Sequence, residues 1–260
     1  MKWTSTLNSI LIGCTLFIIS ACGYQKDDNN KVTIAVASNM RYAIEDIAKK
    51  FTQKTGIVCE LIISSSGKLT AQIKEGAPYH IFISANMKYP YELFENGLTT
   101  KNPEIYAYGK LILWTMIDDI TPSLQMLENK QIKHIALANP KTAPYGSSTI
   151  EILEHYELYD NLKHKLVFGE SISQTNQFIV SKSAEIGFTS KSVVLSSQMK
   201  NKGNWVDIDK AVYSPITQGV VMIKQKNSVA ANTKQFYNFL FSSDARGILE
   251  GYGYDVNTNK

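Results

Sequence analysis

A run of hydroxyl side chains followed by Gly-Lys is the stretch of this 260-residue sequence best suited to bind an anion. Residues 61–73, LIISSSGKLTAQI, pass from an apolar run through three serines into a helical pattern. A nucleotide-binding P-loop needs a glycine five positions before Gly67 and a Ser or Thr after Lys68, but Ile62 and Leu69 stand there. Two interpretations remain open. Either the N–H and hydroxyl groups at a helix N-terminus bind an oxyanion, or one serine only caps the helix.

Three further turns of this kind follow apolar, strand-like runs. They are Ser38-Asn39 after residues 32–37, PKTAPYGSS after 134–139 and GESISQTN after 165–169. Among these turns, only the last contains a carboxylate, Glu170. Ligands of open parallel sheets bind beyond the carboxyl ends of the strands. The turns therefore predict a cleft lined by neutral hydrogen-bond donors from both halves of the chain.

The elements that position these turns follow from the alternation of apolar runs and amphipathic segments. In the first half, strands are predicted at 32–37, 57–63 and 80–85, and helices at 39–55, from the serine turn to about 75, and at 89–95. In the second half, strands are predicted at 110–116, 134–139, 165–169, 185–190 and 215–224, and helices at 123–129, 147–156 and 174–181, followed by C-terminal helices. This order predicts an α/β protein with two lobes, each a mostly parallel sheet flanked by helices.

The N-terminus is typical of a secretory signal. Lys2 precedes an apolar run over residues 7–19, and Ser20-Ala21-Cys22 resembles a bacterial lipobox, in which the cysteine becomes the lipidated first residue. The apolar run is interrupted by polar residues and is shorter than the roughly 20 residues of a spanning helix, which argues against a permanent transmembrane anchor. We expect an extracytoplasmic protein, lipid-anchored to a bacterial membrane on the periplasmic side or at the cell surface.

Charge and cysteine content exclude several other classes. The formal net charge of +4 comes from scattered lysines, and the clusters at 49–50, 163–165 and 200–202 are expected to be solvated faces, so no nucleic-acid partner is predicted. Once Cys14 leaves with the signal and Cys22 is lipidated, Cys59 cannot form an internal disulfide, and we expect a buried, unreactive thiol. No cofactor is predicted.

An enzymatic function finds little support in the sequence. The four histidines lie at no metal-ligand spacing, so no directly coordinated metal is expected, and no G-x-S-x-G nucleophile elbow occurs. A lipoprotein serine hydrolase would need His80 or His134 beside Ser38 or Ser66. Both histidines start predicted strands, a strand length away from the serines. No catalytic residue is assigned, and the hydrolase stays a remote alternative.

The turns and strands, taken in order, resemble a known family. VASNM, SSSGKLTAQI, GAPYHIFISAN, YAYGKLILW, ANPKTAPYG, GESISQTNQFIVSKSAEIGF and PITQGVVMIK together resemble the molybdate-binding component of bacterial molybdate ABC transporters, over nearly all of residues 32–250. The resemblance implies a type II periplasmic binding protein of the Venus-flytrap kind, monomeric, that delivers its ligand to a membrane permease. The expected segments are a signal peptide 1–22, a tether 23–31, lobe I from 32–108 and 219–260, and lobe II from 109–218.

The resemblance also implies the oxyanion-binding residues. Ser38 would come from the first turn, joined by Asn39 as in a branch of the family, and Ser66 would donate from the serine turn. Tyr145 and Ile172 would donate through their backbone N–H groups. Some members add a tyrosine hydroxyl at the position where this chain has Ser190, so the fifth contact is open and Asn39 is the candidate to replace it.

The expected ligand is molybdate or tungstate. Both are fully ionised tetrahedral dianions, which need donors and no acceptor, whereas phosphate carries protons that a donor-only site leaves unpaired at a cost of about 1–3 kcal/mol. Sulfate, another oxyanion or a small carboxylate bound by the same fold is the alternative, because charge alone does not exclude sulfate.

Overall fold

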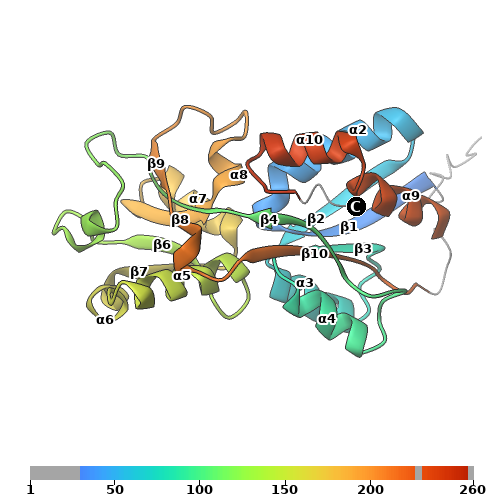
Figure 1. Ribbon diagram of the computed structural model, residues 1–260, viewed down its shortest axis with the longest axis horizontal. Helices are drawn as coiled ribbons and strands as arrows, with labels where there is room; N and C mark the ends of the chain where they lie inside the picture. The colour runs from blue at the N-terminus through green and yellow to red at the C-terminus, as the bar shows by residue number, and fades with distance from the viewer. Residues whose placement is uncertain (1–29, 226–229, 257–260) are drawn as a thin grey trace, which may run out of the picture.

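Two five-stranded β-sheets, each flanked by helices, form the framework of the molecule (Figure 1). The computed structural model describes residues 30–225 and 230–256. The sheets lie at opposite ends of the long axis, the first on the right of Figure 1 and the second on the left. The predicted two-lobed α/β fold is confirmed.

The first sheet has the strand order β2-β1-β3-β10-β4. β1 pairs in parallel with β2 and β3, whereas β10 is antiparallel to both β3 and β4. The elements of this lobe are β1 (Lys31–Ala37), η2 (Ser38–Met40), α2 (Arg41–Thr55), β2 (Val58–Ser64), α3 (Ser66–Lys74), β3 (Ile81–Ser84), α4 (Lys88–Glu95), β4 (Glu104–Gly109), β10 (Ile216–Met222), α9 (Ala230–Leu240) and α10 (Ser243–Gly251).

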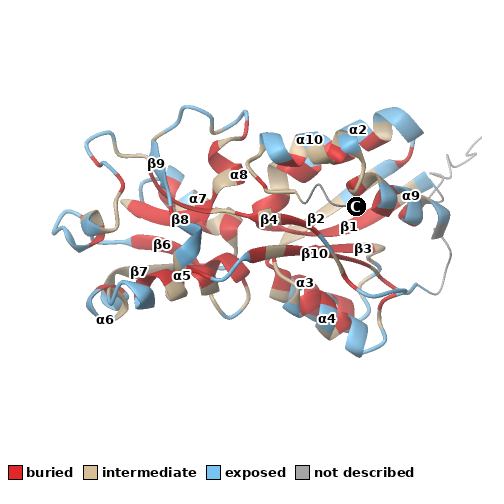
Figure 2. Cartoon of the chain, in the orientation of Figure 1, coloured by how far each residue is buried: buried red, intermediate tan, exposed pale blue. Residues whose placement is uncertain are grey.

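Helices cover both faces of this first sheet. On one face α2, α9 and α10 pack through residues such as Phe51, Phe236 and Leu249. On the other face α3 and α4 pack through Leu69 and Leu93. The central strands are therefore buried on both sides, which explains why β1 reads as a continuous apolar run (Figure 2).

The second sheet has the strand order β7-β6-β8-β5-β9. β6 is parallel to β7 and β8, and β5 is antiparallel to β8 and β9. The elements of this lobe are β5 (Leu111–Thr115), η3 (Gln125–Glu128), β6 (Ile135–Ala138), α5 (Pro144–His155), α6 (Tyr159–Leu162), η4 (Lys163–Lys165), β7 (Leu166–Gly169), α7 (Ile172–Val180), β8 (Ile186–Ser190), α8 (Lys191–Val194), β9 (Asn204–Asp207) and η5 (Lys210–Val212).

Both sheets are thus mixed, with a parallel half and an antiparallel half, because the chain passes twice between the lobes. It leaves the first sheet from β4 into β5 and returns from β9 into β10, so these strands run against their neighbours. The predicted lobe boundaries at 108/109 and 218/219 fall inside β4 and β10. The division into lobes by residue number stays a prediction.

Two local predictions are corrected. The helix expected at 123–129 is only the 3-10 helix η3, because the segment buries little more than Leu127 and packing therefore does not stabilise a longer helix. The edge strands β4 and β9 were not predicted. β9 is exposed at every position, so it lacks the apolar pattern by which a strand is recognised.

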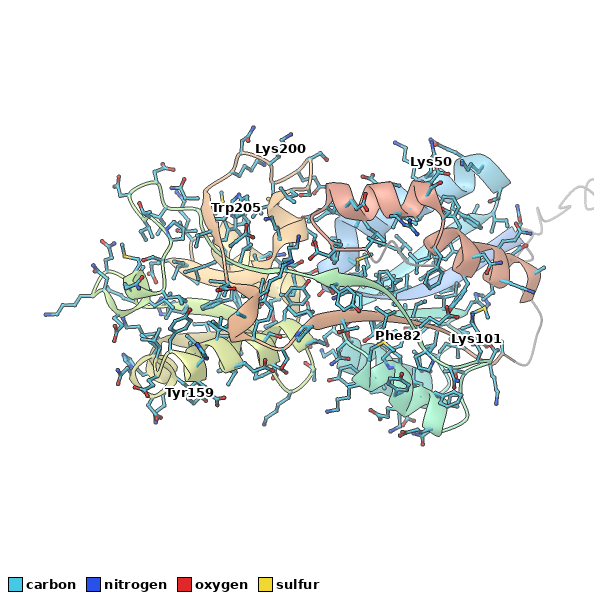
Figure 3. All side chains as sticks on the ribbon, in the orientation of Figure 1. Lys50, Phe82, Lys101, Tyr159, Lys200 and Trp205 are labelled. Atoms are coloured by element: carbon cyan, nitrogen blue, oxygen red, sulfur yellow. The ribbon has the colours of Figure 1, made fainter. Side chains whose placement is uncertain are left out.

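The surface agrees with the expected solvated lysine faces. Lys50 and Lys200 project from the periphery of the two lobes (Figure 3). Cys59 is partly buried rather than buried, and this burial raises the pKa of its thiol to about 12, which disfavours the reactive thiolate. In the part of the chain that the structure describes, no helix is both long and apolar enough to cross a bilayer. The predicted signal peptide, the predicted lipidation residue Cys22 and most of the predicted tether lie outside the described residues.

Candidate functional site

The predicted site residues all follow the carboxyl end of a strand. Ser38 and Asn39 follow β1 and form η2, and Ser66 is the first residue of α3, after β2. In the second lobe Tyr145 lies in the first turn of α5, and Ile172 is the first residue of α7. All five are buried, at 5% exposure or less, although they lie at the starts of helices.

Apolar and polar contacts bring these turns together between the lobes. Ala37 and Ala85 of the first lobe belong to the same buried cluster as Tyr145 and Ile172 of the second. The N–H of Gly67 donates to the carbonyl oxygen of Thr142 across the cleft, at 2.9 Å. The serine turn and the start of α5 are therefore in direct contact, and the lobes are closed on each other.

Further interlobe contacts flank this one on both sides. The Tyr89 hydroxyl donates to the Lys141 carbonyl oxygen at 3.3 Å. On the other side Arg41 Nε donates to Ser173 Oγ at 3.4 Å. Next to Ser38 a groove of about 550 Å³ lies between α2 and α7. The site thus lies deep between the lobes and has an open groove at one side.

The starts of the helices carry unused backbone donors. The first N–H groups of a helix have no intrahelical acceptor. The N-cap residues of η2, α3, α5 and α7 form no side-chain cap hydrogen bond. The helix start at α5 also lies very close to β6, because a Cβ on Gly146 would lie 2.1 Å from the Ala138 carbonyl oxygen. This close approach explains the glycine of the Ala-Pro-Tyr-Gly turn.

The serine turn contains no side-chain cap, which was one of the two interpretations of its sequence. Ser65 is the N-cap residue of α3, but its Oγ is buried and has no hydrogen-bond partner. Ser66 Oγ accepts the N–H of Ala85 at 3.0 Å. A hydroxyl that accepts one bond still has its proton to donate. Both hydroxyls therefore have hydrogens available for a ligand.

Asn39 has a different environment from the serines. Its side-chain amide donates to Gln218 Oε1 at 2.9 Å and to the Tyr254 hydroxyl at 3.0 Å. The Tyr254 hydroxyl in turn donates to the Asn39 carbonyl oxygen at 3.0 Å. Both amide hydrogens of Asn39 are thus engaged, and its backbone N–H is the donor that could face a ligand.

Ser190 also belongs to this buried network. Its hydroxyl donates to the Tyr145 hydroxyl at 3.1 Å and lies 2.8 Å from Ser192 Oγ. Burial, together with the nearby Tyr254, raises the pKa of Tyr145 well above its ordinary value. The Tyr145 hydroxyl is therefore neutral. It is engaged by Ser190, whereas the backbone N–H of Tyr145 lies at the start of α5.

Charged groups lie at the edge of the site. Glu170 forms an ion pair with Lys68 across the lobes, and its side chain is 58% exposed. Arg41 Nη1 lies 3.8 Å from Glu45 Oε1, also with exposed side chains. Within residues 30–225 and 230–256, no group of three or more His, Cys, Asp or Glu residues is arranged to hold a metal ion. The site itself consists of neutral donors.

The histidines considered for a hydrolase have other partners. His80 Nδ1 accepts the Thr33 N–H at 2.8 Å, near the start of β3. His134 lies just before β6, with its Nδ1 3.6 Å from Glu185 Oε2. Both are at the strand ends opposite to Ser38 and Ser66, as expected from the sequence.

Several residues at the site were not identified from the sequence. Ser65, Thr142 and Ser173 lie in the predicted turns, so the turns themselves were the available signal. Gln218 and Tyr254 reach Asn39 from 179 and 215 residues away. No local pattern indicates such distant partners.

Comparison with known proteins agrees with this geometry. Residues 32–255 match the family model described as bacterial extracellular solute-binding protein. The molybdate-binding protein ModA of Rhodobacter capsulatus is 33% identical over 225 residues, covering 86% of this chain and 88% of that protein. YvgL of Bacillus subtilis, named as an ABC transporter substrate-binding lipoprotein, is 28% identical over 233 residues, covering 88% of each.

A solved structure extends the comparison to the fold. The periplasmic molybdate-binding protein of Azotobacter vinelandii superimposes with a TM-score of 0.82 at 30% identity, covering 87% of this chain and all of that one. The matched segment spans both lobes and all four turns that meet between them. The chain belongs to the bacterial extracellular solute-binding proteins.

Proposed function

We propose that this solute-binding protein binds molybdate or tungstate between its lobes, through Ser38, Asn39, Ser66, Tyr145 and Ile172. The observation that carries the proposal is the set of uncapped helix starts, with the hydroxyls of Ser38 and Ser66, which two lobes bring together around a site without acidic or basic side chains. Helix N-termini stabilise anions through their N–H groups and dipoles. The ModA relatives are named for molybdate binding, which supports the same ligand here.

The donor set favours a fully ionised ligand. Molybdate and tungstate bring no proton, so every ligand oxygen can accept a hydrogen bond. A protonated phosphate would have to donate to a group that can only donate, and an unpaired polar group costs about 1–3 kcal/mol. Sulfate is also a dianion without a proton, so its charge does not exclude it. The closed site must discriminate against sulfate by its size.

The deciding experiment is a competition for the purified protein. Protein from medium with equal molybdate, tungstate and sulfate is analysed by native mass spectrometry, in which the added mass distinguishes bound molybdate, tungstate and sulfate, and the result is checked by calorimetric titration with each anion. We expect molybdenum or tungsten at one atom per chain. Bound sulfate that excess molybdate does not displace would assign the site to the alternative oxyanion. A bound small carboxylate would be recognised because the protein then carries none of the three anions.

Closure provides the signal for delivery. A ligand that bridges donors of both lobes favours the closed state by its differential affinity. The solute-binding family implies delivery of the ligand to an ABC permease rather than catalysis, so the chain is a transport component and not an enzyme.

We further propose that the protein acts as a monomer tethered through a lipid on Cys22. The Ser-Ala-Cys sequence at 20–22 and the similarity to the lipoprotein YvgL support the anchor. Metabolic labelling with a clickable fatty acid tests it: the parent chain should be labelled and Cys22→Ser should not. Light scattering of the protein without its signal peptide measures the molar mass in solution and so tests whether the protein is a monomer.

A further inference from the structure

The open groove beside the interlobe site lies between α2 of the first lobe and α7 of the second. It has a volume of about 550 Å³ and is lined by Ser38, one of the proposed ligand residues. The groove on the other side of the site is smaller, about 320 Å³. It is lined by Gly67 and Thr142, which contact each other, and by none of the five proposed ligand residues. The groove beside Ser38 is therefore the side from which an anion reaches the site.

Among the residues that the structure shows to line this groove, two are charged, and both belong to α2. Arg41 lies about one helix turn beyond Ser38, and Glu45 lies one turn farther along α2. The other lining residues, which include Ser173 and Gln177 of α7, are neutral. The order of residues along α2 thus places the positive charge nearer to the site than the negative charge.

The charge of Arg41 is only weakly neutralised by its neighbours. Arg41 Nη1 lies 3.8 Å from Glu45 Oε1, and these side chains are 40% and 43% exposed. Arg41 Nε donates to the neutral Ser173 Oγ at 3.4 Å, which is a long hydrogen bond. Lys68, by contrast, forms an ion pair with Glu170. A cation beside the entrance of a cleft raises the local concentration of an approaching anion and accelerates its binding.

We infer that Arg41 steers the anion into the groove and thereby sets the rate of binding, without being a ligand of the bound anion. The inference rests on the proposed function, because it concerns the same site. The neutral donors hold the anion, and the charge of Arg41 accelerates its arrival. A charge at the edge of a binding site changes the association rate and its salt dependence more than it changes the dissociation rate.

The rates of association and dissociation of molybdate test this role. The chain without its signal peptide is loaded with radioactive molybdate. Equilibrium dialysis gives Kd, a chase with unlabelled molybdate followed by rapid filtration gives koff, and the ratio of koff to Kd gives kon. At low ionic strength we expect Arg41→Gln to lower kon about threefold to tenfold and to leave koff nearly unchanged. In about 1 M salt, where the Debye length is only about 3 Å, the difference in kon should largely disappear.

Three further variants separate the charge from other effects. Arg41→Lys keeps the positive charge without the guanidinium group and should retain most of the parental kon. Glu45→Gln removes the opposing charge from the groove and should raise kon. Lys50→Gln is the matched control, because it removes one positive charge from the same helix, outside the groove (Figure 3), and should leave kon unchanged.

The outcomes that contradict the inference are distinct from a failure of the proposed function. An equal kon in Arg41→Gln and Lys50→Gln would overturn the inference. A loss of affinity that lies in koff would also overturn it, because Arg41 would then be a contact of the closed lobes rather than a steering charge. A parent chain that binds no molybdate in dialysis would contradict the proposed function, and the inference with it.

Discussion

At the scale of single residues, the serine turn shows how adjacent hydroxyls acquire different roles. Ser65 has the position of a cap and makes no cap bond, whereas Ser66 accepts one hydrogen bond from Ala85 and is thereby oriented. The Ala85 N–H, a fixed donor on one side of Ser66 Oγ, directs the proton of the Ser66 hydroxyl to the other side. The anion-binding interpretation of the turn thus has a geometric basis that the cap interpretation lacks.

Replacing Ser66 by alanine should weaken molybdate binding about tenfold or more. The variant loses a hydrogen bond to a charged ligand, which contributes about 1.5–3 kcal/mol. Isothermal titration calorimetry measures the loss. Ser64→Ala, a change at the end of β2 next to the turn, is the control and should bind as the parent does. Equal affinity of the parent and Ser66→Ala would show that Ser66 makes no ligand contact.

His80 should make the first lobe sensitive to acid. Burial and the nearby Lys31 lower the pKa of His80, and its Nδ1 accepts the Thr33 N–H, so the folded chain favours the neutral ring. The unfolded chain binds a proton at its ordinary pKa of about 6.5. The stabilisation is therefore complete above that pH and is lost as the pH falls through the lower folded-state pKa.

The measurement for His80 is the thermal midpoint of unfolding between about pH 7.5 and pH 5, for the parent and His80→Asn. An asparagine oxygen can accept the Thr33 N–H and does not titrate in this range. We expect Tm of the parent to fall more steeply than Tm of His80→Asn. Parallel curves would mean that His80 is not the group responsible.

At the scale of elements, the helix starts determine which backbone groups face the site. The sequence predicted helices at 147–156 and 174–181, but α5 starts at Pro144 and α7 at Ile172. The sequence prediction missed these first turns, although Tyr145 and Ile172 belong to the buried cluster, because glycine, proline and serine residues in and before the turns interrupt the apolar periodicity. The family resemblance, and not the periodicity, identified Tyr145 and Ile172.

The rest of the fold was predictable to the extent that burial leaves a pattern in the sequence. Strands such as β1 and β6, buried on both faces, were found, whereas the exposed β9 was missed. The antiparallel direction of β5 and β10 depends on how the chain crosses between lobes. The partners of Asn39 depend on contacts between distant segments, and neither feature leaves a local pattern.

Proline at position 172 should remove a ligand donor and leave α7 intact. Proline is well tolerated at the first position of a helix, and the preceding Ser171 has an extended backbone (φ −157°, ψ 170°), as a residue before proline prefers. The variant loses the N–H and exchanges the buried isoleucine side chain for the proline ring, and loss of the N–H should lower molybdate affinity about tenfold.

Ile172→Val is the matched control for this change. It trims the buried side chain, which is 3% exposed, but keeps the N–H. Calorimetry should show near-parental affinity for Ile172→Val and weak binding for Ile172→Pro, while circular dichroism shows equal helix content. An affinity loss of the same size in both variants would attribute the effect to side-chain packing instead.

At the scale of the whole molecule, the closed state depends on backbone contacts more than on ion pairs. Lys68 and Glu170 bridge the lobes, but both side chains are exposed, and such pairs contribute about 0–1 kcal/mol. The backbone contact between Gly67 and Thr142 is different, because these half-buried residues leave no space for a further atom between α3 and the turn before α5. Closure should therefore be controlled by the fit at Gly67.

Alanine at position 67 should hold the lobes apart. A Cβ on Gly67 would lie 3.0 Å from Thr142 Cα, 3.1 Å from the Thr142 carbonyl oxygen and 2.9 Å from the Tyr89 hydroxyl. Thr142 belongs to the opposite lobe, so the clash with its backbone exists only when the lobes close, whereas the Tyr89 hydroxyl, from the same lobe as Gly67, is the end of a side chain that can move. Overpacking costs about 1–3 kcal/mol, and molybdate affinity should fall about fivefold to a hundredfold while unliganded stability is unchanged.

Small-angle X-ray scattering with and without molybdate tests this directly. The parent should become more compact when molybdate is added, and Gly67→Ala should do so less. Gly247→Ala is the control, since Gly247 also lies within a helix and its Cβ would meet no atom within 4 Å. Full compaction and parental affinity in Gly67→Ala would show that the Gly67–Thr142 contact does not limit closure, and that the ligand is bound without the tight approach of α3 to α5.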